Sequence, residues 1–229
     1  MSDRFGFLED TQLQRVGSVD QVARLLRGMI ADGHLVQGER LPEVPLSRAI
    51  GVSRNTLRDA IRVLGAEGLV TLELHRGAIV RVLSAQDIKE IYEIRRSLEL
   101  SALVAIDGDD AVALANLKET LAACEEAFKR GDYTAFVEHE LEFHGAIVAN
   151  LGNSRLDDFF ARVLGELRLL FSKLSSDSEP KANKALLTFY RKLFAAVEKG
   201  EVEEAQEMLR EHLDRYEERL SSLVAEAVV

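Results

Sequence analysis

Hydrophobic residues recur at helical spacing through most of the chain. In the first third they predict an amphipathic helix over 18–32, a loop over VQGERLPEVP, a short helix over LSRAI, and a longer helix that Ser53 can cap. Alternating apolar and polar residues in LVTLEL and AIVRVL then predict two strands, joined by a turn that ends at Gly77. Helix, helix–turn–helix and hairpin, in this order, predict a winged helix-turn-helix.

From Ser84 onward the pattern is helical only, broken by glycines and polar runs into six segments. The expected helices cover 84–106, 110–130, 133–151, 154–175, 181–199 and 201–226. The predicted fold class is therefore mainly α: an N-terminal winged helix-turn-helix domain of three helices and a β-hairpin, followed by an all-helical antiparallel bundle of about six helices. We expect the domain boundary between 1–83 and 84–229.

Composition narrows the class of protein. With 47% hydrophobic residues in 229, the chain can bury a core in each of two domains, and its single cysteine, Cys124, excludes a disulfide scaffold. The first residues lack the apolar run of a signal peptide, and no stretch approaches the ~18 apolar residues that span a bilayer. These features predict a soluble, cytoplasmic protein with no membrane partner.

Charge is distributed unevenly between the two predicted domains. Residues 1–83 contain 11 arginines, no lysine and 10 acidic residues, whereas residues 84–229 contain 18 basic and 29 acidic residues. Arginine presents a planar set of donors that suits phosphates and guanine edges, so the first domain can bind nucleic acid although the whole chain carries a net charge of −10.

The helix that Ser53 can cap carries the candidate DNA contacts. A helix that enters the major groove reaches base edges with its N-terminal residues. The polar residues at that end are Ser53, Arg54, Asn55, Thr56 and Arg58, and Arg62 follows one turn later. The alternative, a solvated charged face, leaves the hairpin and the absence of lysine unexplained. We therefore expect double-stranded DNA as a partner.

Six polar side chains interrupt the apolar stripes of the predicted bundle. On a helical projection they share the buried arcs of four helices: Arg95, Glu99, Glu140, His144, Tyr190 and His212. Burying ionisable groups is costly unless they pair, bind a metal or meet a ligand. Arg95 can pair with Glu99 one turn away, and the histidines can be hydrogen-bonded core residues. The pattern favours neither alternative: these side chains can equally pair with one another in the core or line a cavity that binds a ligand or a metal.

The run GERLPEVPLSRAIGVSRNTLRDAIRVLGAEGLVTLELHRGAIVRVL resembles the winged-helix domain of GntR-family transcription regulators. The resemblance covers about residues 15–83. It implies that Arg54, Asn55, Thr56 and Arg58 read the operator, while Arg76 and Gly77 at the wing tip enter the minor groove.

The second half resembles the FCD ligand-binding domain of the FadR subfamily. The matching segments are IYEIRRSLEL, ELEFHGAIVANLGNSRL and FAAVEKGEVEEAQEMLREHL. Many such domains hold a divalent metal through one Asp and three His. Here Glu140 stands at the Asp position, Tyr190 at one His position, and His144 and His212 match. The resemblance implies weak binding of zinc, nickel or manganese by Glu140, His144 and His212, and Arg95 matches an arginine that suits an acidic effector.

The predicted function is that of a ligand-responsive transcription regulator, a repressor that binds a palindromic operator as a homodimer and is released by a small carboxylate. The six polar residues of the bundle would bind this small organic acid. Two alternatives stay open: an effector-free dimeric regulator, and a metal-dependent enzyme acting on a small acid. We expect no enzyme, because the sequence has no Ser/His/Asp, Cys/His or glycine-rich phosphate motif.

Overall fold

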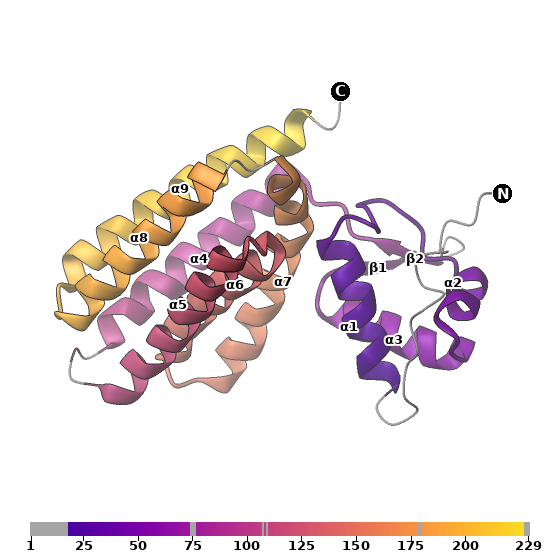
Figure 1. Ribbon diagram of the computed structural model, residues 1–229, viewed down its shortest axis with the longest axis horizontal. Helices are drawn as coiled ribbons and strands as arrows, with labels where there is room; N and C mark the ends of the chain where they lie inside the picture. Colours follow the sequence, from indigo (N-terminus) through magenta and orange to yellow (C-terminus); the bar gives the residue numbers. More distant parts are fainter. Residues whose placement is uncertain (1–17, 74–76, 107, 109, 178–179, 227–229) are drawn as a thin grey trace. The chain divides into compact units, whose positions relative to one another are not determined.

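The computed structural model describes residues 18–73, 77–106, 108, 110–177 and 180–226. The chain divides into two units, Met1–Val82 and Leu83–Val229 (Figure 1).

Within its described residues, the first unit contains three helices and a two-stranded antiparallel sheet. Its elements are α1 (Ser18–Ala31), α2 (Glu43–Ile50), α3 (Arg54–Ala66), β1 (Val70–Glu73) and β2 (Gly77–Val80). Helix α3 packs against α1, α2 and β1. The apolar stripe of α3 supplies the centre of this core, because Leu57, Ile61 and Leu64 are almost fully buried. The winged helix-turn-helix predicted from the sequence is confirmed.

Helix α2 begins earlier than we predicted. It starts at Glu43 rather than Leu46, and so includes Pro45 in its first turn. Proline is tolerated there because a first-turn N–H has no partner within the helix. The helix ends at Gly51, whose φ of 77° lies in the left-handed region that glycine adopts without steric cost. The predicted tight turn before α3 is thus confirmed.

The hairpin pairs Val70 with Val80 and Glu73 with Gly77. Arg40 forms an isolated bridge to Ile79, so the loop before α2 lies along the outer edge of β2. The predicted wing-tip contact Arg76 lies outside the described residues, which stop at Glu73 and resume at Gly77.

The described part of the second unit contains six helices and no strand. They are α4 (Ala85–Ala105), α5 (Ala111–Arg130), α6 (Tyr133–Ala149), α7 (Ser154–Asp177), α8 (Pro180–Glu198) and α9 (Val202–Glu226). Figure 1 shows their long axes running side by side as a bundle. Helix α6 packs against α4, α5 and α7, and α9 packs against α4 and α8. The all-helical bundle is confirmed, with every helix within two residues of its predicted bounds.

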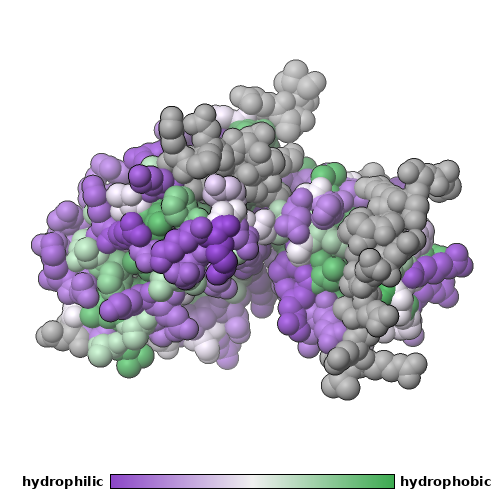
Figure 2. Space-filling model, in the orientation of Figure 1, coloured by the Kyte–Doolittle hydropathy of each residue, from purple (hydrophilic) through white to green (hydrophobic). Residues whose placement is uncertain are grey.

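The face of the helical unit that Figure 2 shows is mainly hydrophilic, with apolar patches between the polar residues. Among the described residues, no helix is both long enough and apolar enough to cross a membrane.

Candidate DNA interface and buried polar cluster

The start of α3 presents the predicted DNA contacts to solvent. Ser53 caps the helix by accepting a hydrogen bond from the Thr56 backbone N–H at 3.0 Å. The next two side chains, Arg54 and Asn55, are exposed. No ion pair within the described part of the chain holds Arg54. An exposed, unpaired guanidinium at a helix N-terminus is free to meet a base edge or a phosphate.

The other two arginines of α3 are paired at the surface. Arg58 donates to Glu43 of α2 through Nη2 at 2.7 Å and Nε at 3.3 Å. Arg62 donates to Asp59 on its own helix at 2.7 Å. The sequence did not predict the role of Glu43, because contact between α2 and α3 depends on their packing angle. DNA would have to compete with Glu43 for Arg58.

The six polar residues predicted on the buried stripes are all buried. They lie on α4, α6, α8 and α9, and none is more than 3% exposed: Arg95, Glu99, Glu140, His144, Tyr190 and His212. We call this set the buried polar cluster. Their burial is confirmed, whereas their role in binding an effector stays a prediction.

A chain of hydrogen bonds links five members of the cluster. Arg95 Nε donates to Glu99 Oε1 at 2.8 Å, and Glu99 Oε2 lies 2.6 Å from His144 Nδ1. On the other side of the ring, His144 Nε2 lies 2.9 Å from the Tyr190 hydroxyl, which also donates to Glu140 Oε1 at 2.8 Å. The chain crosses from α4 through α6 to α8, so it fixes three helices relative to one another.

His212 joins the cluster through ring contacts. Its ring stacks on Phe189 at 4.2 Å with an interplanar angle of 9°, and on His144 at 5.6 Å with an angle of 22°. It also lines a surface pocket of about 240 Å³ between α8 and α9, where the positive charges of Lys192 and Arg215 outnumber the single negative charge of Glu211. His212 therefore stands between the buried polar cluster and a cationic opening at the surface.

Burial sets the protonation of the cluster. It raises the pKa of Glu140 to about 7, against the opposing effects of the Tyr190 hydrogen bond and the Arg95 charge. Burial lowers the pKa of His144, and it lowers that of His212 well below its usual value with help from His144 and Arg95. Burial also raises the pKa of Glu99, but the charges of Arg95 and His144 outweigh it and leave that pKa below its usual value.

Two buried donors have no hydrogen-bond partner among the described residues. They are Arg95 Nη2 and the hydroxyl of Tyr92, which lies one turn earlier on α4. The Arg95 guanidinium carbon lies 5.0 Å from the centre of the Tyr92 ring. Unpaired buried polar groups are rare in native proteins and call for a partner such as a ligand or water. Sequence analysis missed Tyr92, because an aromatic residue on an apolar stripe is typical of a core.

The three predicted metal ligands come together. One ligand atom each from Glu140, His144 and His212 lies within 4.8 Å of the others, so the predicted grouping is confirmed. The fourth side chain at this point is the Tyr190 phenol. Burial and the nearby Glu140 raise its pKa well above the usual value, which keeps it neutral. Zinc and related ions take imidazole, thiolate or carboxylate donors, so the residues present do not fit a divalent ion while the phenol holds two of them.

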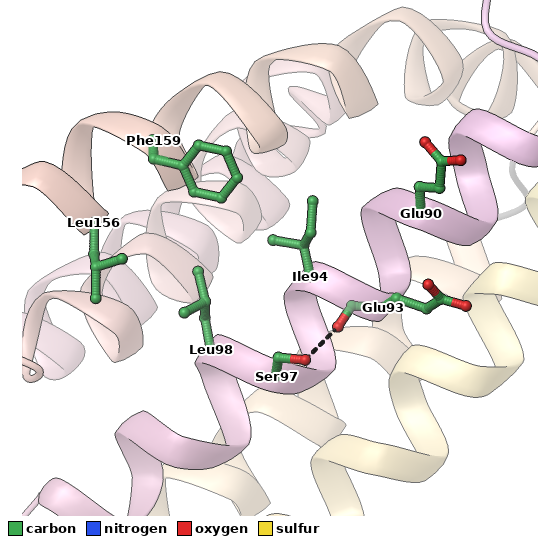
Figure 3. A pocket seen from close by; sticks show the side chains of 7 residues that line it. All are labelled: Glu90, Glu93, Ile94, Ser97, Leu98, Leu156 and Phe159. Atoms are coloured by element: carbon green, nitrogen blue, oxygen red, sulfur yellow. Dashed lines mark hydrogen bonds between the residues drawn. The ribbon is translucent and has the colours of Figure 1, made fainter.

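A separate groove of about 480 Å³ opens between α4 and α7 (Figure 3). Ile94 and Leu98 of α4 face Leu156 and Phe159 of α7 across it, and Phe159 is 44% exposed. Glu90 and Glu93 of α4 are among the other residues that line the groove. Apolar side chains left open to water in this way are typical of a surface that contacts another molecule.

Comparisons with known proteins agree with both units. Residues 18–80 match the family of bacterial regulatory proteins called gntR, and residues 90–215 match the FCD domain. The HTH-type transcriptional regulator YdhC of Bacillus subtilis (strain 168) is 29% identical over 88% of this chain and 90% of its own length. The HTH-type transcriptional repressor GlaR of Escherichia coli (strain K12) is 29% identical over 83% of this chain and 90% of its own.

A solved structure supports the same assignment. The crystal structure of a GntR transcriptional regulator from Rhodococcus sp. RHA1 is 32% identical and covers 88% of this chain and 96% of its own, with a TM-score of 0.77. An architecture with a winged helix-turn-helix before an FCD domain fits the FadR-like subfamily. The chain belongs to the GntR family of DNA-binding transcription regulators and carries an FCD domain.

Proposed function

We propose that this regulator is a repressor that binds a palindromic operator as a homodimer in the cytoplasm and is released by a small organic acid. Residues 1–83 would bind DNA, and residues 84–229 would bind the effector and dimerise. The repressor GlaR, similar over most of this chain, supports the sign of regulation. The relatives named above are described as transcription regulators, which supports our prediction that this protein is not an enzyme.

The proposed DNA contacts fall into two classes. Ser53, Arg54, Asn55, Thr56 and Arg58 would read base edges, because they occupy the N-terminal end of α3. The residues proposed for the backbone and the wing are Arg62, Arg76 and Gly77. Since a dimer with two-fold symmetry presents two such helices, its site should be a palindrome.

A single observation carries the effector proposal: Arg95 Nη2 is buried without a hydrogen-bond partner beside the equally unpartnered Tyr92 hydroxyl. A carboxylate has two acceptor oxygens and forms strong charge-assisted bonds with a desolvated guanidinium. The surface pocket at His212 is lined by two basic residues, Lys192 and Arg215, and one acidic residue, Glu211, a balance that favours anions. The Arg95–Glu99 pair and the linked histidine favour the alternative, a self-satisfied core without an effector.

The experiment is a thermal-shift screen of small organic acids, followed by operator titration with each hit. We expect a hit to raise Tm and weaken operator binding, a coupling typically of about 1–3 kcal/mol. Tyr92→Phe removes only the unpartnered hydroxyl and should reduce the response. Arg95→Lys keeps a charge beside Glu99 but loses the free Nη2, and should abolish it. If no acid shifts Tm, the effector-free alternative is correct. If both variants respond as the wild type does, an acid binds elsewhere and the unpartnered groups of Arg95 and Tyr92 are not its site.

The groove between α4 and α7 is our candidate for the dimer surface, with a second copy of this chain as its occupant. The α4 side of the groove carries two acidic residues, Glu90 and Glu93, while the exposed Arg155 and Arg162 flank its α7 residues in sequence. A two-fold axis can set opposite charges of two copies against each other.

Sedimentation should therefore show a dimer that Phe159→Asp dissociates. The control is Val112→Asp, at an apolar residue of α5 that is 71% exposed.

A further inference from the structure

The Tyr190 hydroxyl lies between two side chains of another helix. It reaches from α8 to Glu140 Oε1 at 2.8 Å and to His144 Nε2 at 2.9 Å, both on α6. An ion that joined these two atoms would have to lie about 2.0–2.2 Å from each. The phenol oxygen already lies within hydrogen-bond distance of both atoms, so an ion that joined them would compete with it for the same two side chains.

The hydrogen bonds of this centre are complete without a cation. A phenol has one proton and two neighbours here, so it donates to one and accepts from the other. In one arrangement the phenol donates to the Glu140 carboxylate and accepts from a protonated His144 Nε2. In the other, protonated Glu140 donates to the phenol, and the phenol donates to His144 Nε2. Both arrangements hold the same number of protons and leave the pair Glu140 and His144 with no net charge. Since the charges of Arg95 and Glu99 also cancel, no negative charge of the cluster is left for a cation to neutralise.

We infer that the Tyr190 hydroxyl takes the place of a divalent ion as the link between α6 and α8, so that this regulator folds as a metal-free protein. The rest of an ion-binding frame is retained. Glu99 holds His144 Nδ1 at 2.6 Å, the contact by which a carboxylate orients a metal-binding histidine. Together with His144, the side chains of Glu140 and His212 offer three potential ligand atoms within 4.8 Å of one another. A single substitution at Tyr190 should therefore create a site that the wild type lacks.

The first arm of the test uses the full-length, tag-free wild-type protein. It is incubated with zinc, passed through a desalting column, and its metal content is determined by elemental analysis. We expect no zinc above background and no change in Tm when EDTA is added. Uptake of about one zinc per chain that is lost in His144→Ala would overturn the inference.

The second arm supplies the missing ligand through Tyr190→His. This variant should bind about one zinc per chain, and EDTA should lower its Tm, because metal that binds only the folded state stabilises it. Adding His144→Ala to the same variant should remove the zinc and the EDTA effect together. A Tyr190→His protein that melts cooperatively yet takes up no zinc would show that the cluster is not an ion-binding frame. If that variant does not fold, the wild-type arm still decides.

Discussion

The charged residues of the two units stand in opposite surroundings. In the winged unit the pair between Arg58 and Glu43 has side chains that are 48% and 31% exposed. In the helical unit the pair between Arg95 and Glu99 has side chains that are 1% and 0% exposed. Surface pairs contribute about 0–1 kcal/mol, whereas breaking a buried pair costs about 3–5 kcal/mol. Candidate DNA contacts can thus be changed at little cost to the fold, while candidate effector contacts are part of the core.

The largest effect expected from this difference is on the stability of the helical unit. Glu99→Ala leaves the Arg95 guanidinium buried and unpaired, and removes the partner of His144 Nδ1. We expect it to lower the free energy of unfolding by about 3–5 kcal/mol, measured by urea denaturation.

The matched control for Glu99 is Glu43→Ala, which also removes the carboxylate partner of an arginine, but at the surface. It should cost less than about 1 kcal/mol. Equal losses for the two variants would remove the distinction between the units.

The next effect concerns operator affinity, where the winged unit should show the reverse behaviour. Arg54→Ala and Arg58→Ala should each weaken operator binding by about 1–3 kcal/mol if the arginine contacts a base in bidentate fashion. Neither should change Tm appreciably, because both side chains are exposed. Fluorescence anisotropy with the native operator and thermal melts of the same samples measure the two quantities. Two variants that bind as tightly as the wild type would show that α3 is not the recognition helix.

The sequence predicts features that depend on spacing along one helix, but not the contacts between helices. The 3.6-residue period located the six helices of the bundle and the burial of Arg95, Glu99, Glu140 and His144, because a helical projection depends on sequence spacing alone. It could not show that Glu99 bonds to a histidine 45 positions away. That contact depends on how α4 packs against α6.

Two further misses have local causes. Helix α2 begins three residues before its predicted start, because Pro45, which would break the interior of a helix, is tolerated in the first turn. The role of Tyr92 could not be predicted, because the helical period shows that a tyrosine is buried but not whether its hydroxyl finds a partner.

A third effect should appear as a pH dependence of the helical unit. Burial raises the pKa of Glu140 in the folded protein to about 7, above its ordinary value of 4.5. The folded state therefore binds this proton more tightly than the unfolded state does. Its contribution to stability is complete below about pH 4.5 and is lost as the pH rises through 7.

The measurement is urea denaturation at pH 5.5 and pH 8. Between these values the wild type should lose about 1–2 kcal/mol more than Glu140→Gln, which cannot ionise. Parallel pH profiles for the two proteins would mean that Glu140 stays ionised in the folded state.

The smallest effect tests the outer edge of the proposed DNA contact. Arg62 lies two turns into α3, beyond the residues that would reach base edges, and its side chain is 65% exposed beside Asp59. If it contacts a phosphate, Arg62→Ala should make the negative slope of log Kobs against log salt shallower by about 0.9. Discrimination between operator and scrambled DNA should stay the same, because a phosphate contact carries no sequence information. Stability should change by less than about 1 kcal/mol, since the pair with Asp59 is exposed. Asp59→Asn is the matched control: it releases Arg62 without removing it, so the slope should not become shallower. A slope unchanged by Arg62→Ala would place this arginine away from the DNA and limit the contact to the first turns of α3.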